Sequence, residues 1–281
     1  MLNKKTLLIS FSSLVMLSIS SQAILINSFT AATNDRFANN SNFIADSYNL
    51  SGMGLTTNGR WATLVSENVF VSSNHYHPSN GQAISFYATN NAAGGSITRT
   101  VSSGQRIGDT DIWVGVLSTS VDSSYAFYDI GLAPNIGQNS FMTGRSASSN
   151  PTTTQDVAFG RNILDSLLTN QEVDDPSGGA TGNAILAIYN NPLGEVDYEA
   201  LVEGGDSGAP MFTVDSVSGE LIIVGTNWFE GGGTFESSGF TNLSADRDAI
   251  LSIISANAVP EPSSVALISL ASLMLISKRK R

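Results

Sequence analysis

A serine lies between glycines in the stretch LVEGGDSGAPMF, Leu201 to Phe212, immediately before an apolar segment. A nucleophilic serine needs a base that takes its proton, a group that orients the base, and donors for the developing oxyanion. Glycines let the backbone turn so that N–H groups point into a cleft. Gly204, Gly205 and Gly208 therefore make Ser207 a candidate nucleophile, although a plain glycine-rich turn has the same composition.

The candidate bases are the two histidines, His75 and His77, in VFVSSNHYHPSNG. They follow the strand-like run LVSENVFVSS, so a base here would lie at a strand end. The orienting acid has two candidates, Asp111 in GDTDIWVGVLS and Asp129 in FYDIGLAPN, and each precedes apolar residues that a sheet could hold. Exposed loop histidines and turn aspartates are the competing structural interpretations.

Several other chemistries lack their residues. The chain has no cysteine, which excludes disulfides, a thiol nucleophile and thiolate metal sites. Two histidines and scattered acids show no metal-ligand spacing. We therefore expect no metal and no cofactor. An esterase on another fold would need a G-x-S-x-G elbow, but Ala209 occupies its closing glycine position.

Short apolar or β-branched segments separated by Gly, Asn and Asp predict the frame that carries these residues. Examples are QAISFYAT, DIWVGVLS, NAILAIYN, APMFTV and LIIVGTNWF. Many short strands with frequent turns indicate an all-β barrel or sandwich. The polar stretch 133–155 is expected to link two halves. Residues 244–257 predict a helix that Ser244 can cap, with Ile250, Leu251 and Ile254 on one face.

The motif GDSGAP resembles the nucleophile motif of trypsin-like serine proteases, which have the chymotrypsin fold. VFVSSNH is similar to that family's strand-to-histidine segment, with Ser73-Asn74 in place of Ala-Ala, and DIWVGVLS to its triad-aspartate segment. The order His, Asp, Ser is also the family's order. The resemblance covers 52–257. It implies two antiparallel β-barrels, at about 50–135 and 155–243, followed by the short helix 244–257, within a protease domain 24–258.

Carried over residue by residue, the resemblance makes Ser207 the nucleophile, His75 the general base and Asp111 the orienting acid, with Asp129 as the alternative. It implies that the N–H groups of Gly205 and Ser207 form the oxyanion hole. Leu201 occupies the position of the substrate-pocket floor, where trypsin has an acid, and so favours apolar substrate side chains. Cleavage after Ala23 would free an amine on Ile24 that could reach Asp206, unless local amides satisfy that carboxylate.

Both ends of the chain have the pattern of targeting signals. Residues 1–23 have a basic start, an apolar run and a small-residue end, which predicts a secretory signal peptide. Residues 259–281 contain Pro260-Glu261-Pro262, a short apolar segment and a basic end, and they resemble the PEP-CTERM sorting signal of Gram-negative bacteria. That resemblance implies an exosortase-type partner, transient membrane anchoring by a short transmembrane segment, and delivery to the surface or outside; an ordinary anchor is the alternative.

The charge distribution argues against nucleic acid as a partner. All four lysines lie at the ends of the chain, and the body between Ala23 and Lys278 carries seven arginines against 24 acidic residues. Such a body repels nucleic acid and anionic lipid. The residues thus favour an exported serine endopeptidase that acts on a protein or peptide substrate. The alternative is a catalytically inactive surface or extracellular-matrix protein on the same fold.

Overall fold

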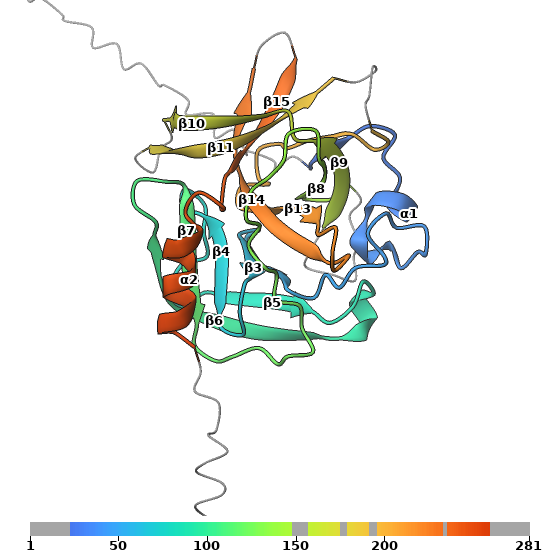
Figure 1. The fold of residues 1–281 in the computed structure, drawn as a ribbon. Helices are drawn as coiled ribbons and strands as arrows, with labels where there is room; N and C mark the ends of the chain where they lie inside the picture. The colour runs from blue at the N-terminus through green and yellow to red at the C-terminus, as the bar shows by residue number, and fades with distance from the viewer. Residues whose placement is uncertain (1–22, 148–156, 175–178, 191–195, 233–234, 259–281) are drawn as a thin grey trace, which may run out of the picture.

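Strands dominate the computed structural model, which describes residues 23–147, 157–174, 179–190, 196–232 and 235–258. The predicted signal peptide, apart from Ala23, and the predicted sorting tail lie outside the described residues. The remaining chain forms two groups of antiparallel strands (Figure 1). These sheets confirm the expected all-β class. Short alternating segments with one apolar face are stable only when they are packed into sheets.

The first group closes into a six-stranded barrel in the order β2-β3-β4-β7-β6-β5. Its strands are β2 (Met53–Leu55), β3 (Trp61–Leu64), β4 (Val69–Ser73), β5 (Ala83–Tyr87), β6 (Ser96–Arg106) and β7 (Ile112–Leu117). β4 and β7 pair directly, with Ser73 opposite Ile112. This register places the residue after β4 beside the residue before β7. The candidate site is built at these two strand ends.

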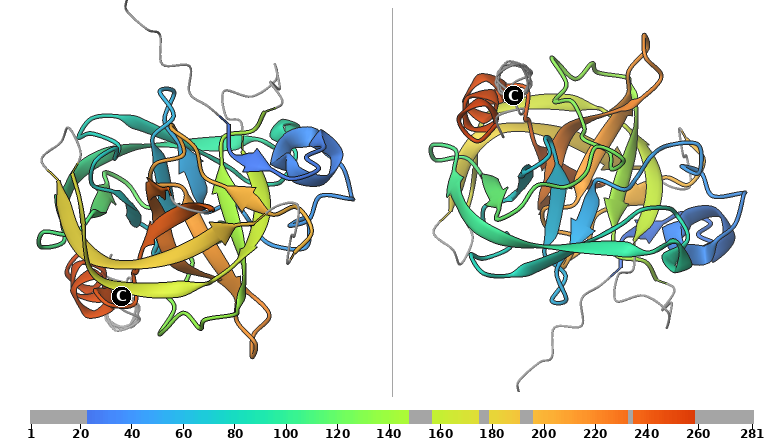
Figure 2. Two further views of the ribbon diagram at one scale, coloured as in Figure 1. Left: turned by 90° about the horizontal axis from the view of Figure 1, so that it is seen from above. Right: turned by 90° about the horizontal axis from the view of Figure 1, so that it is seen from below.

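The second group is a seven-stranded sheet in the order β10-β11-β15-β14-β13-β8-β9. Its strands are β8 (Asn139–Gly144), β9 (Ala158–Ile163), β10 (Ser166–Val173), β11 (Ala180–Tyr189), β13 (Pro210–Val214), β14 (Leu221–Gly231) and β15 (Glu236–Thr241). Figure 2 shows that both groups of strands curve around their interiors. A second barrel was expected; among the described residues no pairing joins the edge strands β10 and β9, so this group is a curved sheet.

The second group also begins earlier than expected, because β8 lies inside the stretch 133–155 that was predicted to be a link. Its sequence, NSFMTG, is mostly polar or small, yet five of its six residues are buried. Side-chain hydrogen bonds satisfy this polarity: Ser140 Oγ donates to the Asn162 carbonyl and Thr143 Oγ1 donates to the Pro210 carbonyl. A search for apolar periodicity does not detect a strand whose buried polar groups are hydrogen-bonded in this way.

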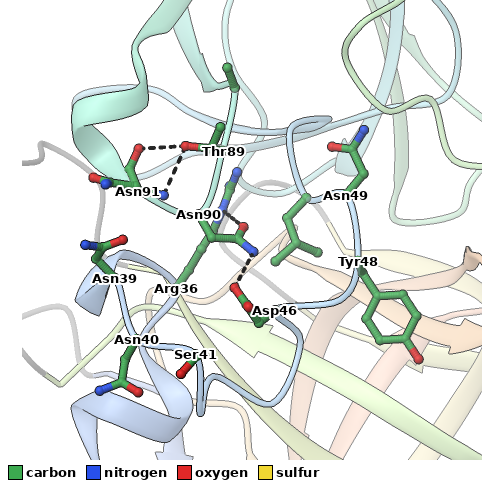
Figure 3. A pocket seen from close by; sticks show the side chains of 12 residues that line it. Arg36, Asn39, Asn40, Ser41, Asp46, Tyr48, Asn49, Thr89, Asn90 and Asn91 are labelled. Carbon is green, nitrogen blue, oxygen red and sulfur yellow. Dashed lines mark hydrogen bonds between the residues drawn. The ribbon is translucent and has the colours of Figure 1, made fainter.

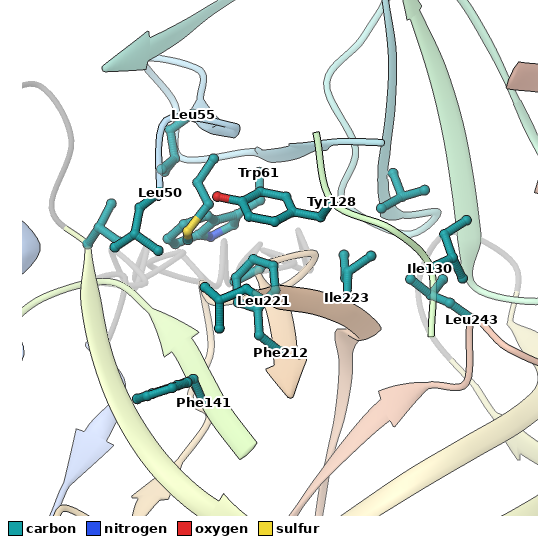
Figure 4. Close-up of a cluster of buried hydrophobic side chains, with 14 of the residues drawn as sticks. Leu50, Leu55, Trp61, Tyr128, Ile130, Phe141, Phe212, Leu221, Ile223 and Leu243 are labelled. Carbon is teal, nitrogen blue, oxygen red and sulfur yellow. The ribbon is translucent and has the colours of Figure 1, made fainter. Parts of the chain in front are cut away.

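One hydrophobic cluster joins the two halves (Figure 4). Trp61 and Val69 come from the barrel, and Phe212 and Ile223 come from the sheet. The connecting segment adds Tyr128, whose ring lies 4.7 Å from that of Phe212 between centroids. Because this core runs across the boundary, the two halves have a fixed relative position, which a site built from both of them requires.

Short elements complete the fold. β1 (Leu25–Ile26) pairs with β12 (Ala200–Leu201), and the chain also forms α1 (Ala31–Asn34) and two 3₁₀ turns, at Arg36–Ala38 and Ala92–Gly94. No helix in the described part of the chain is long and apolar enough to cross a membrane.

The C-terminal helix α2 (Arg247–Ala256) packs Ile250 and Ile254 against the shared core. It starts three residues later than expected, and the predicted cap at Ser244 is wrong. Asp246 is the N-cap residue, while the Ser244 hydroxyl donates to Asn242 Oδ1, 2.7 Å away, within the preceding turn. A short polar side chain satisfies a turn as readily as a helix start, and only the course of the chain distinguishes them.

Candidate active site

His75 and Asp111 form a hydrogen-bonded pair at the end of the barrel. Asp111 Oδ2 lies 2.8 Å from His75 Nδ1, and Asp111 Oδ1 accepts the backbone N–H of His75 at 2.9 Å. The backbone of Asn74 donates to the Asp111 carbonyl at 2.7 Å. The carboxylate therefore holds both the ring and the backbone of His75.

This pair has the burial that a base and its orienting acid need. The Asp111 side chain is fully buried and the His75 side chain is 18 % exposed. A buried carboxylate on Nδ1 favours the tautomer with the proton on that nitrogen, which leaves Nε2 free to accept a proton.

The alternative acid lies elsewhere. Asp129 is exposed and lines a cavity together with Leu221 and Ile222, and neither histidine lines that cavity. Its backbone carbonyl accepts the N–H of Ile223. Of the two candidates left open by the residue pattern, the structure brings Asp111 to His75 and does not bring Asp129.

The loop that carries Ser207 packs against the end of β4. Gly205 has φ 110° and Gly208 has φ 82°, values that favour glycine. A Cβ added to Gly208 would lie 3.0 Å from the backbone nitrogen of Ser73 and 2.7 Å from Ser72 Oγ. Gly208 thus allows the serine loop of the sheet to approach the strand that leads to His75.

Ser207 is partly exposed, and among the described residues no hydrogen bond joins its hydroxyl to the His75 ring. Catalytic hydrogen bonds are often long in proteins without substrate and shorten in the complex. The backbone N–H groups of Gly205 and Ser207 likewise donate to no other described residue. Two unbonded N–H groups beside a serine can bind a developing negative charge.

Asp206 is buried next to the candidate nucleophile. Its carboxylate accepts the N–H of Arg145 at 2.6 Å and the N–H of Glu203 at 3.0 Å. The backbone nitrogen of Ile24 donates to the Arg145 carbonyl at 3.1 Å. Local backbone amides therefore bind the Asp206 side chain. The backbone nitrogen of Ile24 bonds to Arg145, which in turn bonds to Asp206.

Burial raises the pKa of Asp206 to about 8, and its two backbone donors oppose part of that effect. The folded protein therefore keeps a proton that the unfolded chain loses above its ordinary pKa of 3.8. We expect the stabilising contribution of this proton to be lost as pH rises from about 4 to about 8, with a slope of at most about 1.4 kcal/mol per pH unit. Urea unfolding across this pH range would measure the slope. It should be smaller in Asp206→Asn than in Asp129→Asn, an exposed control; equal slopes would contradict the assignment.

His77 does not join the pair. Its ring stacks on Trp113, with centroids 3.6 Å apart and an interplanar angle of 7°, and its Nδ1 donates to the Pro78 carbonyl at 2.9 Å. Trp113 belongs to β7, two residues after Asp111. The residue pattern gave no indication of this stack, because it joins segments that are distant in the sequence.

Burial, reinforced by the nearby Arg60 and His75 and opposed by the Pro78 bond and Asp111, lowers the pKa of His77 below 6.5. We expect stability to be full above 6.5 and to fall as pH decreases through the folded-state value. With two histidines in the chain, NMR titration can follow each imidazole signal. The signal that disappears in His77→Phe, which keeps an aromatic ring on Trp113, should have a midpoint below 6.5. A midpoint at or above 6.5 for that signal would contradict the effect.

Leu201 and a group of acids complete the surroundings of the serine loop. Leu201 is 5 % exposed and pairs with Leu25; its role as a substrate-pocket floor stays a prediction. Glu203 has a raised pKa, caused first by burial and then by the charges of Glu230 and Glu236. The sequence pattern did not indicate that these three carboxylates influence one another, because they come from different segments.

A separate cavity of about 680 Å³ lies between the N-terminal segment and the chain after β5 (Figure 3). Asparagines dominate its lining, beside the buried Arg36, whose guanidinium donates to Asn90 Oδ1 and to the Tyr87 carbonyl. None of the candidate catalytic residues lines it. No cluster of three or more metal-ligating side chains occurs in the described part of the chain.

No protein-family model matches this chain, and no curated protein matches it. Its strands, closed barrel and single C-terminal helix are compatible with a chymotrypsin-like fold.

Proposed function

We propose that this protein is an exported serine endopeptidase that works through Ser207, His75 and Asp111. The observation that carries the proposal is the His75–Asp111 hydrogen bond of 2.8 Å at the end of β4, where the Gly-flanked serine loop packs. A buried acid, a partly exposed imidazole, and a serine loop whose two N–H groups donate to no other described residue are the parts that acyl transfer requires.

In the proposed reaction the Ser207 oxygen attacks the carbonyl carbon of a peptide bond while His75 Nε2 takes the hydroxyl proton. The carbonyl oxygen gains negative charge and accepts hydrogen bonds from the N–H groups of Gly205 and Ser207. Asp111 stabilises the imidazolium. His75 then gives its proton to the leaving amine, and the bond between carbon and nitrogen breaks. Water, activated by His75, releases the acyl group from Ser207 in the second half of the cycle.

We also propose how the protein reaches its place of action. Residues 1–23 would direct export, and residues 259–281 would anchor the chain transiently in the membrane until an exosortase-type enzyme processes the tail. The final location would be the surface or the exterior of a Gram-negative cell. The support is the sequence pattern of the two ends. Apart from Ala23, both ends lie outside the described residues.

A fluorophosphonate probe tests the proposed activity directly, because it reacts with a serine that a base activates. We expect one label per folded chain, no label on Ser207→Ala, and no label on His75→Ala. Circular dichroism would show that the variants are folded. A folded wild-type chain without label would instead favour the catalytically inactive surface or matrix protein.

A further inference from the structure

Asn227 lies in β14 behind the serine loop and is 2 % exposed. Its side-chain nitrogen Nδ2 donates to the Asp206 carbonyl at 3.1 Å and to the Thr143 carbonyl at 3.0 Å. Its Oδ1 is buried and has no hydrogen-bond partner in the described part of the chain. The opposite orientation of the amide would place Oδ1 against two carbonyl oxygens, so the two bonds determine how the side chain lies.

The Asp206 carbonyl and the Ser207 N–H belong to one peptide unit. In a planar trans peptide the C=O and the N–H point in opposite directions. The Asp206 carbonyl has two donors, the Asn227 side chain at 3.1 Å and the backbone N–H of Ala209 at 3.0 Å. By holding the carbonyl, these donors direct the N–H of Ser207 to the opposite side of the peptide. That N–H donates to no other described residue, and it is one of the two proposed oxyanion donors.

The backbone of Asn227 holds the other side of the loop. Its carbonyl accepts the N–H of Gly208 at 2.9 Å, and its N–H donates to the Ala209 carbonyl at 2.9 Å. These backbone bonds do not depend on the side chain. A substitution at residue 227 can thus remove the bond to Asp206 while the loop stays attached to β14.

We propose that Asn227 is a positioning residue, whose side-chain amide acts together with the N–H of Ala209 to hold the plane of the Asp206–Ser207 peptide so that the Ser207 N–H can bind the oxyanion. This inference rests on the proposed function. It assigns to the sheet half of the molecule a role in transition-state binding, while the barrel half supplies the base and the acid.

The test compares Asn227→Leu with Asn162→Leu. Asn162 is a matched control, because it is also buried and its Nδ2 also donates to two carbonyls, those of Ile188 and Ala200, outside the serine loop. Both variants lose two bonds from Nδ2 to carbonyls, and Asn162→Leu also loses the bond that Oδ1 accepts from the N–H of Ile163 at 2.7 Å, so the control is at least as disruptive. Thermal unfolding would establish a temperature at which both are folded, and kcat and KM for a peptide ester would be measured there.

We expect kcat of Asn227→Leu to fall about 10- to 100-fold with little change in KM, because loss of a complete oxyanion donor costs about 10²- to 10³-fold. Asn162→Leu should keep kcat within about twofold of wild type. The affinity of Asn227→Leu for a peptide boronic acid, which forms a tetrahedral adduct with a serine, should decrease in parallel with kcat, and product binding should not change.

The outcomes separate the two proposals. If wild type neither turns over nor takes the fluorophosphonate label, the proposed function fails. If wild type is active and the kcat of Asn227→Leu equals that of Asn162→Leu, the positioning role is overturned and Asn227 is a structural residue only. A loss that appears in KM and product binding would overturn it as well, because a misplaced oxyanion donor affects the transition state.

Discussion

Replacing Ser207 with alanine should lower kcat by on the order of 10⁵-fold while the protein stays folded. The side chain is partly exposed and forms no hydrogen bond with another described residue, so its removal leaves no buried group without a partner. The catalytic loss is large because attack on the carbonyl carbon needs the hydroxyl oxygen itself. Hydrolysis of an activated peptide ester would measure the decrease.

Ser73→Ala is the matched control for this prediction. Ser73 lies at the end of β4 close to Gly208, and its buried hydroxyl has no hydrogen-bond partner in the described part of the chain. Removing that hydroxyl should change kcat by less than about twofold, since it supplies neither proton transfer nor charge stabilisation. Retention of a tenth or more of the activity in Ser207→Ala would exclude this serine as the nucleophile.

Replacing Asp111 with asparagine should lower kcat by about 10⁴-fold near neutral pH. The amide oxygen can still accept the N–H of His75, as Oδ1 does now at 2.9 Å. The amide nitrogen would then face Nδ1 and donate to it, which moves the ring proton to Nε2. A ring protonated at Nε2 cannot take the serine proton, so geometry is kept while the base is lost.

The corresponding change at Asp129 distinguishes the two acids that the residue pattern proposed. Asp129 is exposed and lines a cavity that His75 does not line, so Asp129→Asn should keep kcat within about twofold. Hydrolysis of a peptide ester near neutral pH would measure kcat of both variants. Equal losses in the two variants, or the larger loss at Asp129, would contradict the assignment of Asp111.

The local pattern predicted the strands whose apolar residues repeat along one segment. DIWVGVLS contains β7, APMFTV contains β13, and LIIVGTNWF forms most of β14. It failed for β8 (Asn139–Gly144) and β15 (Glu236–Thr241), whose buried polar side chains and glycines carry little hydrophobic signal. Strand pairing and side-chain hydrogen bonds stabilise such segments, and both depend on partners far away in the sequence.

Residue types and local order were enough to indicate a β-rich chain, a candidate serine between glycines, and two histidines and two aspartates from which a base and its acid could come. The family resemblance favoured Asp111 over Asp129, and the structure brings Asp111 to His75. The approach of Gly208 to Ser73, the stacking of His77 on Trp113 and the contact of Asn227 with Asp206 follow from folding alone. Each of these depends on strand register or on packing between the barrel and the sheet. Such contacts join residues tens to more than a hundred positions apart, and no short-range periodicity encodes them.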